Sequence, residues 1–278
     1  MSLSISSLNS GSNGNCYYVG NVEEAVFIDA GLTCRETERR MKRLGLSMKK
    51  VKAIFVTHGH ADHIAGIHKI SKKYQLPVYI TSRTMAETRL KLDKGLIRQF
   101  RADVPIQIGK LQITPFPILH DSEDPHGFVV ESESIRVGVF TDIGVANPPV
   151  IHHFRKCHAA FLEANYDEAL LETGPYPLHL KDRIRGGKGH LSNSQALQLF
   201  LEHRPLFMTH LFLGHLSQNN NSAEIVQELF SGVAGHTEIA IASRHRETPV
   251  YHIDPGLDSL AVHHRPAQRD SVHQLSLF

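Results

Sequence analysis

The sequence contains no tryptophan and only three cysteines, Cys16, Cys34 and Cys157, in 278 residues. Because the cysteines are odd in number and widely spaced, without a Cys-x-x-Cys pair, we expect neither a disulfide framework nor a thiolate metal site, and we expect a reducing compartment. The N-terminus lacks the basic and apolar segments of a signal peptide. No apolar run approaches the roughly 18 residues of a membrane-spanning helix. These absences predict a cytoplasmic protein without membrane association.

A charge excess of either sign is also missing, since 30 Lys and Arg stand against 28 Asp and Glu. A net charge of +2 neither requires nor excludes a nucleic-acid partner, so any basic surface must be local. The apolar content of 41% is enough for a large core and argues against a disordered chain. Histidine is the residue in excess, with 20 copies.

Short strand-like runs alternate with helical patterns along most of the chain. "CYYVG" and "EAVFIDAG" predict a hairpin, and "TCRETERRMKRLG" predicts a helix capped by Thr33. "HADHIAGIHKISKKYQ" predicts a second helix, and "RPLFMTH" a later strand. Interleaved strands and helices predict one α/β layered domain over residues 1–255, with two sheets and helices outside them. The pattern fails after Gly256, so residues 256–278 are expected to form a flexible tail.

The segment "FVTHGHADHIAG" carries the strongest chemical signal. An apolar strand runs into a loop that holds His58, His60, Asp62 and His63 just before a helix. Imidazole nitrogens and carboxylate oxygens are the ligands expected for Zn²⁺ and similar divalent ions. A histidine-rich solvated loop is the alternative, but four ligand types at this spacing favour a metal site.

This H-x-H-x-D-H pattern after an apolar strand resembles the signature of the metallo-β-lactamase fold superfamily. The resemblance implies a four-layer αβ/βα sandwich with one or two metals at the edge between its sheets. It also implies further ligands at later strand ends, with Asp142 bridging two ions and Asp29 orienting the histidine loop. The two implied ligand groups are His58, His60 and His120, and Asp62, His63 and His215.

Two of these assignments leave alternatives open. "MTHLFLGHLS" offers His210 as well as His215 for the last ligand, although the "HLSQNN" context favours His215. His126 is a weaker alternative to His120 and is more simply explained as a loop histidine near the site. The all-nitrogen and oxygen donor set suits two ions of zinc, manganese or iron.

Several local features narrow the resemblance. Secreted β-lactamases commonly carry cysteine at the bridging position of Asp142, and the interval from Asp142 to His215 is too short for the domain that β-CASP nucleases insert. "SLNSGSNGNCYYV", "HDSEDPHGFVV", "FTDIG", "LEANYD", "GPYPLHLKDRIRGGKGHLSN" and "HLSQNNNSAE" resemble the YycJ/WalJ branch, which implies a 5′-to-3′ exonuclease on DNA. The alternatives are a small-molecule hydrolase, such as a cyclic phosphodiesterase or thioesterase, an RNA-processing nuclease, and a binding module without activity.

Phosphodiester hydrolysis also needs a proton donor for the leaving oxygen. The resemblance gives that role to His190 in "KGHLSN", and Glu163 in "LEAN" can orient its ring. Asp62 counts with them as a catalytic residue because it would hold a metal at the reacting centre. The alternative for Glu163 is a buried carboxylate bonded only to backbone.

Substrate contacts are expected from basic and small polar residues near these positions. A basic run beside His190 suits phosphate binding, although a charge run is often only a solvated helix face. "NSGSNGN" offers backbone amides for a phosphate, or is simply a hairpin turn. The expected substrate-binding residues are Ser10, Gly11, Ser12, Asn165, Lys181, Arg183, Arg185 and Asn193.

The chain ends in "QLSLF" after a polar run. Gln274, Leu275, Leu277 and Phe278 resemble the pentapeptide by which bacterial replication and repair proteins bind the sliding clamp. A polar tether carrying apolar anchors is how a disordered segment engages a preformed pocket. The alternative is a tail that folds back on its own domain. DNA, with RNA as the lesser alternative, and a sliding clamp are therefore the expected partners.

Overall fold

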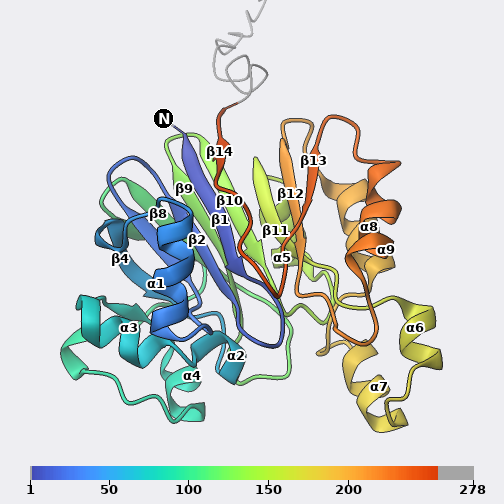
Figure 1. Cartoon of the computed structure of the whole chain (residues 1–278), viewed down its shortest axis with the longest axis horizontal. Coiled ribbons are helices and arrows are strands. Elements are labelled where there is room, and N and C mark those ends of the chain that lie inside the picture. Colours follow the sequence, from blue (N-terminus) through green and yellow to red (C-terminus); the bar gives the residue numbers. More distant parts are fainter. Residues whose placement is uncertain (1, 256–278) are drawn as a thin grey trace, which may run out of the picture.

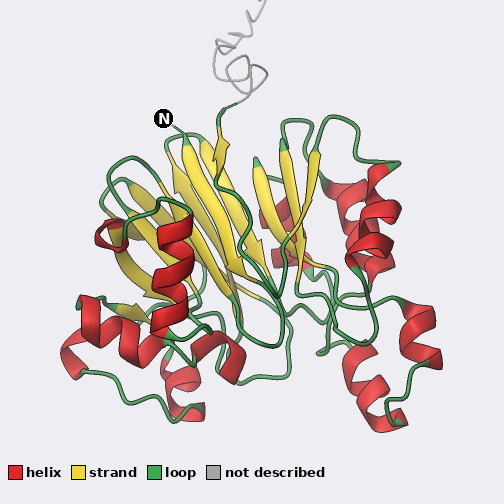
Figure 2. Ribbon diagram, viewed as in Figure 1, coloured by secondary structure: helices red, strands yellow, loops and turns green. Residues whose placement is uncertain are grey.

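The computed structural model describes residues 2–255, which form two seven-stranded sheets packed face to face (Figures 1 and 2). The first sheet has the strand order β14-β1-β2-β3-β4-β5-β6 and the second the order β13-β12-β11-β10-β9-β8-β7. The strands of the first sheet are β1 Leu3–Asn9, β2 Cys16–Gly20, β3 Ala25–Ile28, β4 Val51–Phe55, β5 Val78–Tyr79, β6 Ile97–Arg98 and β14 Tyr251–Ile253. Those of the second are β7 Ile106–Ile108, β8 Leu111–Pro117, β9 His126–Ser132, β10 Ile135–Phe140, β11 Ala159–Glu163, β12 His210–Gly214 and β13 Glu238–Ile241.

Helices cover the outer face of each sheet, α1 and α3 on the first and α5, α8 and α9 on the second (Figure 1). The α-helices are α1 Cys34–Arg43, α2 Ala61–Ile64, α3 Ile67–Tyr74, α4 Ser82–Glu87, α5 Pro148–Phe154, α6 Glu168–Thr173, α7 Leu178–Arg185, α8 Asn193–His203 and α9 Ala223–Ser231. Two short 3₁₀ helices are η1 Met48–Lys50 and η2 Lys94–Leu96. In the described part of the chain, none is long and apolar enough to cross a membrane.

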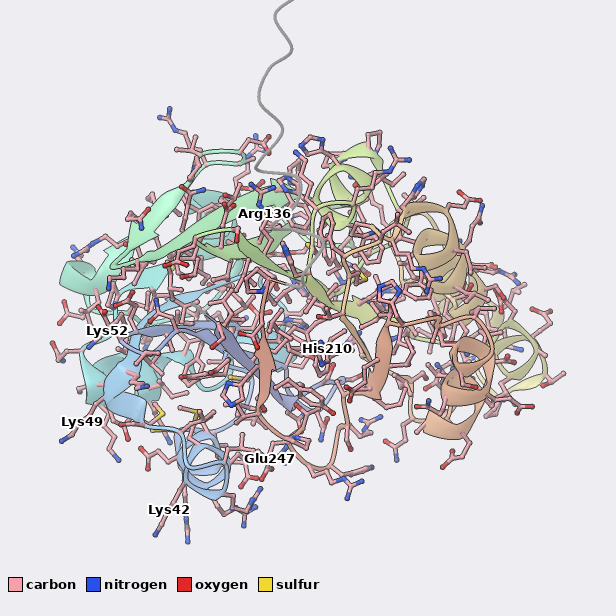
Figure 3. The ribbon with its side chains drawn as sticks, turned by 90° about the horizontal axis from the view of Figure 1, so that it is seen from above. Lys42, Lys49, Lys52, Arg136, His210 and Glu247 are labelled. Atoms are coloured by element: carbon pink, nitrogen blue, oxygen red, sulfur yellow. The ribbon has the colours of Figure 1, made fainter. Side chains whose placement is uncertain are left out.

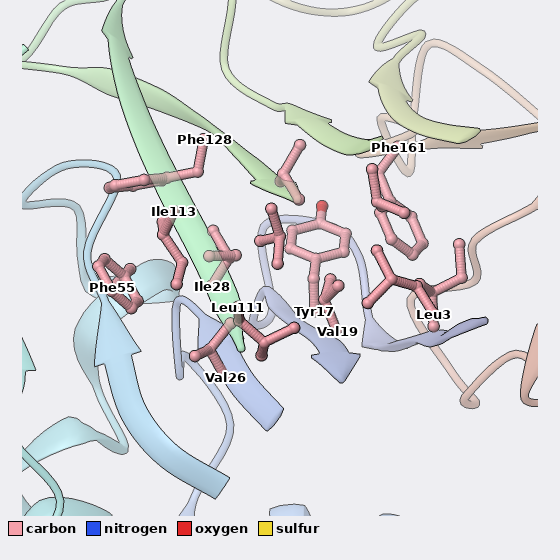
Figure 4. Close-up of a cluster of buried hydrophobic side chains, with 14 of the residues drawn as sticks. Leu3, Tyr17, Val19, Val26, Ile28, Phe55, Leu111, Ile113, Phe128 and Phe161 are labelled. Atoms are coloured by element: carbon pink, nitrogen blue, oxygen red, sulfur yellow. The ribbon is translucent and has the colours of Figure 1, made fainter. Parts of the chain in front are cut away.

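Three apolar layers hold these elements together. The central layer lies between the sheets, where Tyr17 and Phe161 pack with ring centroids 5.0 Å apart among buried aliphatic side chains (Figure 4). The other two layers lie between each sheet and its helices. Helix–sheet–sheet–helix is the predicted four-layer αβ/βα sandwich, and the fold prediction is confirmed.

Strand direction brings the candidate site to one edge. β3, β4, β5 and β6 are parallel to one another, and so are β10, β11, β12 and β13. β8 also runs in the direction of β10, because both are antiparallel to β9. The carboxyl ends of these strands meet at the lower edge in Figure 1, beside α2, α4 and α7. Loops that follow such strand ends are the usual place for ligand sites in α/β sheets.

The predicted hairpin and the first helix are confirmed as β2, β3 and α1, and the Thr33 hydroxyl accepts the backbone N–H of Glu36. The predicted second helix is wrong in its continuity, because it breaks into α2 and α3 at Gly66. Gly66 lies so close to the backbone that a Cβ there would come within 1.8 Å of the Leu32 oxygen.

The strand predicted over "RPLFMTH" is also wrong, since β12 begins only at His210. Leu206, which would have been inside that strand, has 86% of its surface exposed. The N-terminal strand β1 was not predicted at all; it pairs with β2 and β14 in the interior of the sheet. The expected tail, residues 256–278, lies outside the described residues, and so do the four residues of the predicted clamp-binding peptide.

Candidate metal centre

Loops from both sheets bring the predicted ligands to a single cluster. The histidine motif runs from the end of β4 into α2, and four further members follow the ends of β3, β8, β10 and β12. Glu163 is the last residue of β11, and His190 lies in the connection between α7 and α8. The cluster comprises Asp29, His58, His60, Asp62, His63, His120, Asp142, Glu163, His190 and His215. Residues up to 186 positions apart in sequence thus meet because their strands end at the same edge.

His58, His60 and His120 form the first group, with one ligand atom of each within 4.8 Å of the others. Nδ1 of His60 and Nε2 of His120 are 3.3 Å apart. That separation is about the edge of a tetrahedron whose metal–nitrogen bonds are about 2.0–2.1 Å. Nε2 of His58 is fully buried without a hydrogen-bond partner among residues 2–255, as expected of a ligand atom that faces a cation.

Asp62, His63 and His215 form the second group, again within 4.8 Å of one another. Asp142 lies between the groups: its Oδ2 is 3.1 Å from Nε2 of His63, and it also forms a group with His58 and His63. Nε2 of His215, like that of His58, is buried without a hydrogen-bond partner from the described residues. The donor set therefore fits divalent cations on both sides of a shared carboxylate.

The ring nitrogens that face away from the cluster are fixed by protein acceptors. Nδ1 of His63 donates to Asp29 Oδ2 over 2.7 Å, and Nδ1 of His215 to Glu163 Oε1 over 2.9 Å. Nδ1 of His120 donates to a backbone carbonyl, and that of His58 contacts the hydroxyl of Thr57 at 2.9 Å. Such partners set the tautomer that leaves Nε2 free for a metal.

Three cluster residues have left-handed backbone conformations, namely Asp29 (φ 60°), Asp142 (φ 55°) and His215 (φ 55°). Each directly follows or nearly follows the end of a strand, where the sharp turn aims its side chain into the cluster. Such backbone conformations cost on the order of 1–3 kcal/mol for a residue other than glycine, and they concentrate at functional sites.

The electrostatics also favour a bound cation. Burial holds the pKa of His58 well below its usual value, which keeps the ring neutral, as metal ligation requires. Burial alone would lower the pKa of His63, but the carboxylates of Asp142, Asp29 and Asp62 raise it well above its usual value. The pKa of His215 is raised to about 10 against the same effect of burial, chiefly by Asp142. The carboxylates around His63 and His215 thus attract positive charge, which a divalent cation would supply in place of protons on the rings.

His190 and Glu163 lie beside the two groups. Nδ1 of His190 donates to Glu163 Oε1 over 2.6 Å, and the ring centroids of His190 and His120 are 5.1 Å apart. The side chain of His190 remains 18% exposed, whereas Glu163 is fully buried. Burial opposes protonation of His190, yet Glu163 raises its pKa above the usual value. Glu163 also accepts the backbone N–H of Ile143, so its predicted backbone bond and its contact with His190 are both present.

The basic run on α7 is largely paired with acids. Arg183 forms an ion pair with Asp121, and Arg185 pairs with Asp182 and Glu172. Nζ of Lys181 donates to the backbone carbonyl of Glu172. These pairs place the run beside the cluster, but they leave its members less available to a phosphate than the sequence suggests.

The small polar residues expected to bind substrate are mostly used inside the protein. Ser10 is buried, and its hydroxyl accepts the backbone N–H of His215 over 2.8 Å. The backbone N–H of Gly11 donates to Asn15 Oδ1, whereas Ser12 is exposed. Asn165 donates to the backbone carbonyl of His215, and Asn193 is buried against Asn221. The geometry thus points to positioning roles for all of these except Ser12.

Two residues near the cluster were missed by sequence reasoning. Nδ2 of Asn15 lies 3.1 Å from Asp62 Oδ2 and 2.9 Å from His63 Nε2. Oδ1 of Asp121 lies 3.2 Å from Nε2 of His120 and, within the described part of the chain, is buried without a hydrogen-bond partner. Asp121 directly follows His120 in the sequence, and that adjacency was the available signal.

The two alternative histidines lie outside the cluster. His210 is the first residue of β12, at the opposite end of that strand from His215, and it is labelled near the centre of the view from above in Figure 3. Its Nε2 is 3.4 Å from Glu238. His126 begins β9 and packs edge to face on Phe100. Neither belongs to a metal-type group among residues 2–255.

Comparison with known proteins agrees with this geometry. A family model described as a β-lactamase superfamily domain matches residues 24–215, which is more than half of the chain. The chain belongs to the β-lactamase superfamily. Among its superfamily relatives, the exodeoxyribonuclease YycJ of Bacillus anthracis is 31% identical over 238 residues, covering 84% of this chain and 89% of that protein. The exodeoxyribonuclease WalJ of Streptococcus pneumoniae (strain D39) is 28% identical over 223 residues, covering 78% of this chain and 83% of that protein.

The metallo-β-lactamase fold protein YhfI from Bacillus subtilis has the same fold, with a TM-score of 0.70 at 16% identity over 91% of this chain and all of that one. The predicted family and branch are thus confirmed. This superfamily member is a metal-dependent hydrolase, and its histidine and aspartate cluster fits divalent metal binding.

Proposed function

We propose that the protein is an exonuclease that hydrolyses the phosphodiester bonds of DNA from the 5′ end at a centre of two divalent ions. The observation that carries the proposal is the arrangement of two donor groups on either side of Asp142, with the Glu163–His190 pair beside them. Two metals can stabilise both the attacking and the leaving oxygen of an in-line displacement at phosphorus, and an adjacent acid can protonate the leaving oxygen.

His58, His60 and His120 would hold one ion, Asp62, His63 and His215 would hold the other, and Asp142 lies between the two groups. Ions bound there would polarise the phosphodiester and lower the pKa of a water molecule to yield the nucleophile. Zinc, manganese and iron all suit a donor set of imidazole and carboxylate.

The chain's own residues then hold and move the protons. Glu163 keeps a proton on Nδ1 of His190 and orients the ring, because an ionised carboxylate can only accept. The partly exposed edge of His190 is free to give a proton to the departing oxygen of the strand, as a general acid. Asp29 and Thr57 act at a distance by fixing the rings of His63 and His58.

The named relatives support DNA as the substrate, since those called exodeoxyribonuclease align over most of their own length. Ribonuclease J 1 of Streptococcus pyogenes matches over only 24% of its length, at 27% identity, so RNA is the lesser alternative. An exonuclease on DNA would serve replication or repair, and the cysteine usage predicts a reducing compartment such as the cytoplasm for it.

We also propose the domain division into a hydrolase of residues 1–255 and a tail of residues 256–278 that binds a sliding clamp. The support is the QLSLF sequence together with the nuclease proposal. Deletion of residues 274–278 should abolish co-elution with the clamp while hydrolysis of free DNA continues. Unchanged co-elution would contradict the proposal.

The main test is digestion of single-stranded DNA, duplex DNA and RNA, labelled at either end, with added Mn²⁺ or Zn²⁺. The wild type should release mononucleotides from the 5′ end of DNA faster than from RNA, and Asp62→Ala and His190→Ala should both be impaired. Loss of cleavage in Asp62→Ala alone would support the metal centre and show that His190 has no role in the mechanism. Absence of cleavage by the wild type with either metal would refute the proposal.

A further inference from the structure

A cavity of about 700 Å³ opens at the same edge of the sheets as the metal cluster but contains none of its residues. It lies where β5 and β6 end and where β9 begins. Its size is within the range of about 300–1,000 Å³ that small ligands occupy. The loop from His120 to His126 joins the two places, because its first residue belongs to the cluster and its last lines the cavity.

Two arginines that line the cavity have no partner in the part of the chain that the structure describes. Arg83 and Arg101 are exposed, and neither has an ion pair or a side-chain hydrogen bond to any residue between 2 and 255. Arg183 and Arg185 on α7, by contrast, are paired with carboxylates. Two free guanidinium groups that face one cavity present the forked donors that a phosphate binds.

Other residues that line the cavity are apolar and aromatic. Phe100 packs edge to face on His126, with centroids 5.1 Å apart at 86°, and on Phe128 at 5.5 Å and 70°. Val104 stands beside them with 53% of its surface exposed, although it is a large apolar residue. Aromatic and apolar surface next to cationic groups is the combination that binds a nucleotide of a single strand.

His126 supplies a buried polar group to the same cavity. It is only 4% exposed, and its Nδ1 donates to the backbone carbonyl of Asp124 over 2.9 Å. Its Nε2 has no hydrogen-bond partner in the described part of the chain and is therefore available to a ligand in the cavity. The carboxylate of Asp124 also lines the cavity, so a phosphate is repelled from this side and directed to the arginines.

The position of the cavity relative to the metal cluster indicates which kind of ligand it binds. β4, β5 and β6 are consecutive neighbours in the sheet, and His58 follows the end of β4. At about 4.8 Å between strands, the ends of β5 and β6 lie roughly 5–10 Å sideways from that of β4. This is the reach of about one to three nucleotides at the rise of about 3.4 Å per nucleotide of a stacked strand.

We propose that this cavity binds one nucleotide of the strand being hydrolysed, with its phosphate against Arg83 and Arg101 and its base against Phe100, Val104 and His126. The inference rests on the proposed function, because it takes the substrate to be a nucleic-acid strand. The cavity then holds the strand beside the metal centre, outside the cluster itself.

Binding of a short, fluorescein-labelled, single-stranded phosphorothioate oligonucleotide tests the proposal by fluorescence anisotropy, independently of hydrolysis. The double variant Arg83→Gln/Arg101→Gln should bind about tenfold more weakly than the wild type. The variant loses the contact to one phosphate, and each such contact contributes about 0.7 to the slope of log K against log salt for single strands. The magnitude of that slope should therefore fall by roughly 0.7. Both arginines are exposed and unpaired, so the double variant should melt at the temperature of the wild type.

The matched control is Lys42→Gln/Lys49→Gln, which removes the same charge from the opposite edge of the sheets (Figure 3). It should bind as the wild type does. Equal binding by the arginine variant and the wild type, or an equal loss in both double variants, would overturn the proposal. Thymidine monophosphate and the unlabelled strand are also compared as competitors of the oligonucleotide. Equal displacement at equal concentration would overturn the proposal, because the cavity would then bind a free nucleotide.

Failure of this inference is distinguishable from failure of the proposed function. Hydrolysis of bis(p-nitrophenyl) phosphate by the wild type reads the metal centre alone, since this small diester does not reach the cavity. If the wild type hydrolyses the diester but the oligonucleotide binds equally well without the two arginines, the cavity is not a strand-binding site, and the proposed activity stands. If binding depends on the two arginines but no hydrolysis occurs, the proposed nuclease activity is refuted, and the cavity remains a strand-binding site.

Discussion

Oε1 of Glu163 accepts a hydrogen bond from Nδ1 of His190 across 2.6 Å. The same oxygen accepts Nδ1 of His215 across 2.9 Å, and Oε2 accepts the backbone N–H of Ile143 across 2.7 Å. A single buried carboxylate thus orients a ring of the metal cluster and the ring proposed to protonate the leaving group. Glu163 thus links the histidine and aspartate cluster to the proposed general acid.

The first prediction concerns the leaving group. His190→Ala should lower kcat on DNA by about 10²–10⁴-fold, because the departing sugar oxygen needs a proton. Glu163→Gln should lower it by about 10–100-fold, as loss of an orienting partner does. Bis(p-nitrophenyl) phosphate, whose nitrophenolate leaves without protonation, should be hydrolysed by His190→Ala at nearly the wild-type rate. Equal losses on both substrates in steady-state assays would show that His190 is not the acid.

The second prediction concerns the last ligand. His215→Ala should lower metal affinity by more than the roughly 10–100-fold that loss of an outer partner causes. His210→Ala is the matched control, because His210 begins β12 whereas His215 follows its end. It should keep the full metal content, as measured by plasma emission spectrometry after dialysis. Full metal content in His215→Ala would remove that residue from the ligand set.

The third prediction concerns the N-terminal segment. Ser10→Ala should lower the free energy of unfolding by about 1–3 kcal/mol, because the buried N–H of His215 loses its acceptor. Ser12→Ala, at an exposed position two residues away, should stay within about 0.5 kcal/mol of the wild type. Urea denaturation measures both. Equal stability of the two variants would mean that Ser10 does not anchor the loop of His215.

The fourth prediction concerns removal of the metal. A chelator should lower the melting temperature, since a ligand at 100 times its dissociation constant stabilises a fold by about 2.7 kcal/mol. Restored Zn²⁺ or Mn²⁺ should reverse the shift. In Asp62→Ala the shift should be smaller, because one donor group is incomplete. A melting temperature that no chelator changes, in a protein shown to contain metal, would contradict a structural contribution of the ions.

The sequence was sufficient for elements and residues whose signal is local. The spacing of His58, His60, Asp62 and His63 is visible in six consecutive positions, and the strand before them is continuously apolar. The Thr33 cap and the β2–β3 hairpin also depend on neighbours in the chain alone. Local chemistry of this kind does not depend on which segments pack together later.

Misplaced elements arose where tertiary contacts override local preference. "RPLFMTH" has the composition of a strand, but β12 begins only at His210, in register with Ala159 of β11. The helix after His63 is broken at Gly66 by the close approach of the Leu32 carbonyl. Neither the register nor the approach leaves a mark in the segment itself.

The sequence by itself determined the donor types and, through the resemblance, the order in which they occur along the chain. Only the tertiary structure decided that Ser10 is buried behind His215, that Arg183 is paired with Asp121, and that Arg83 and Arg101 stand free beside a cavity. The physical reason is that a charge or hydroxyl is identical in sequence whether it is paired or not. Its availability to a substrate depends on partners that parallel strands bring to the same edge from distant parts of the chain.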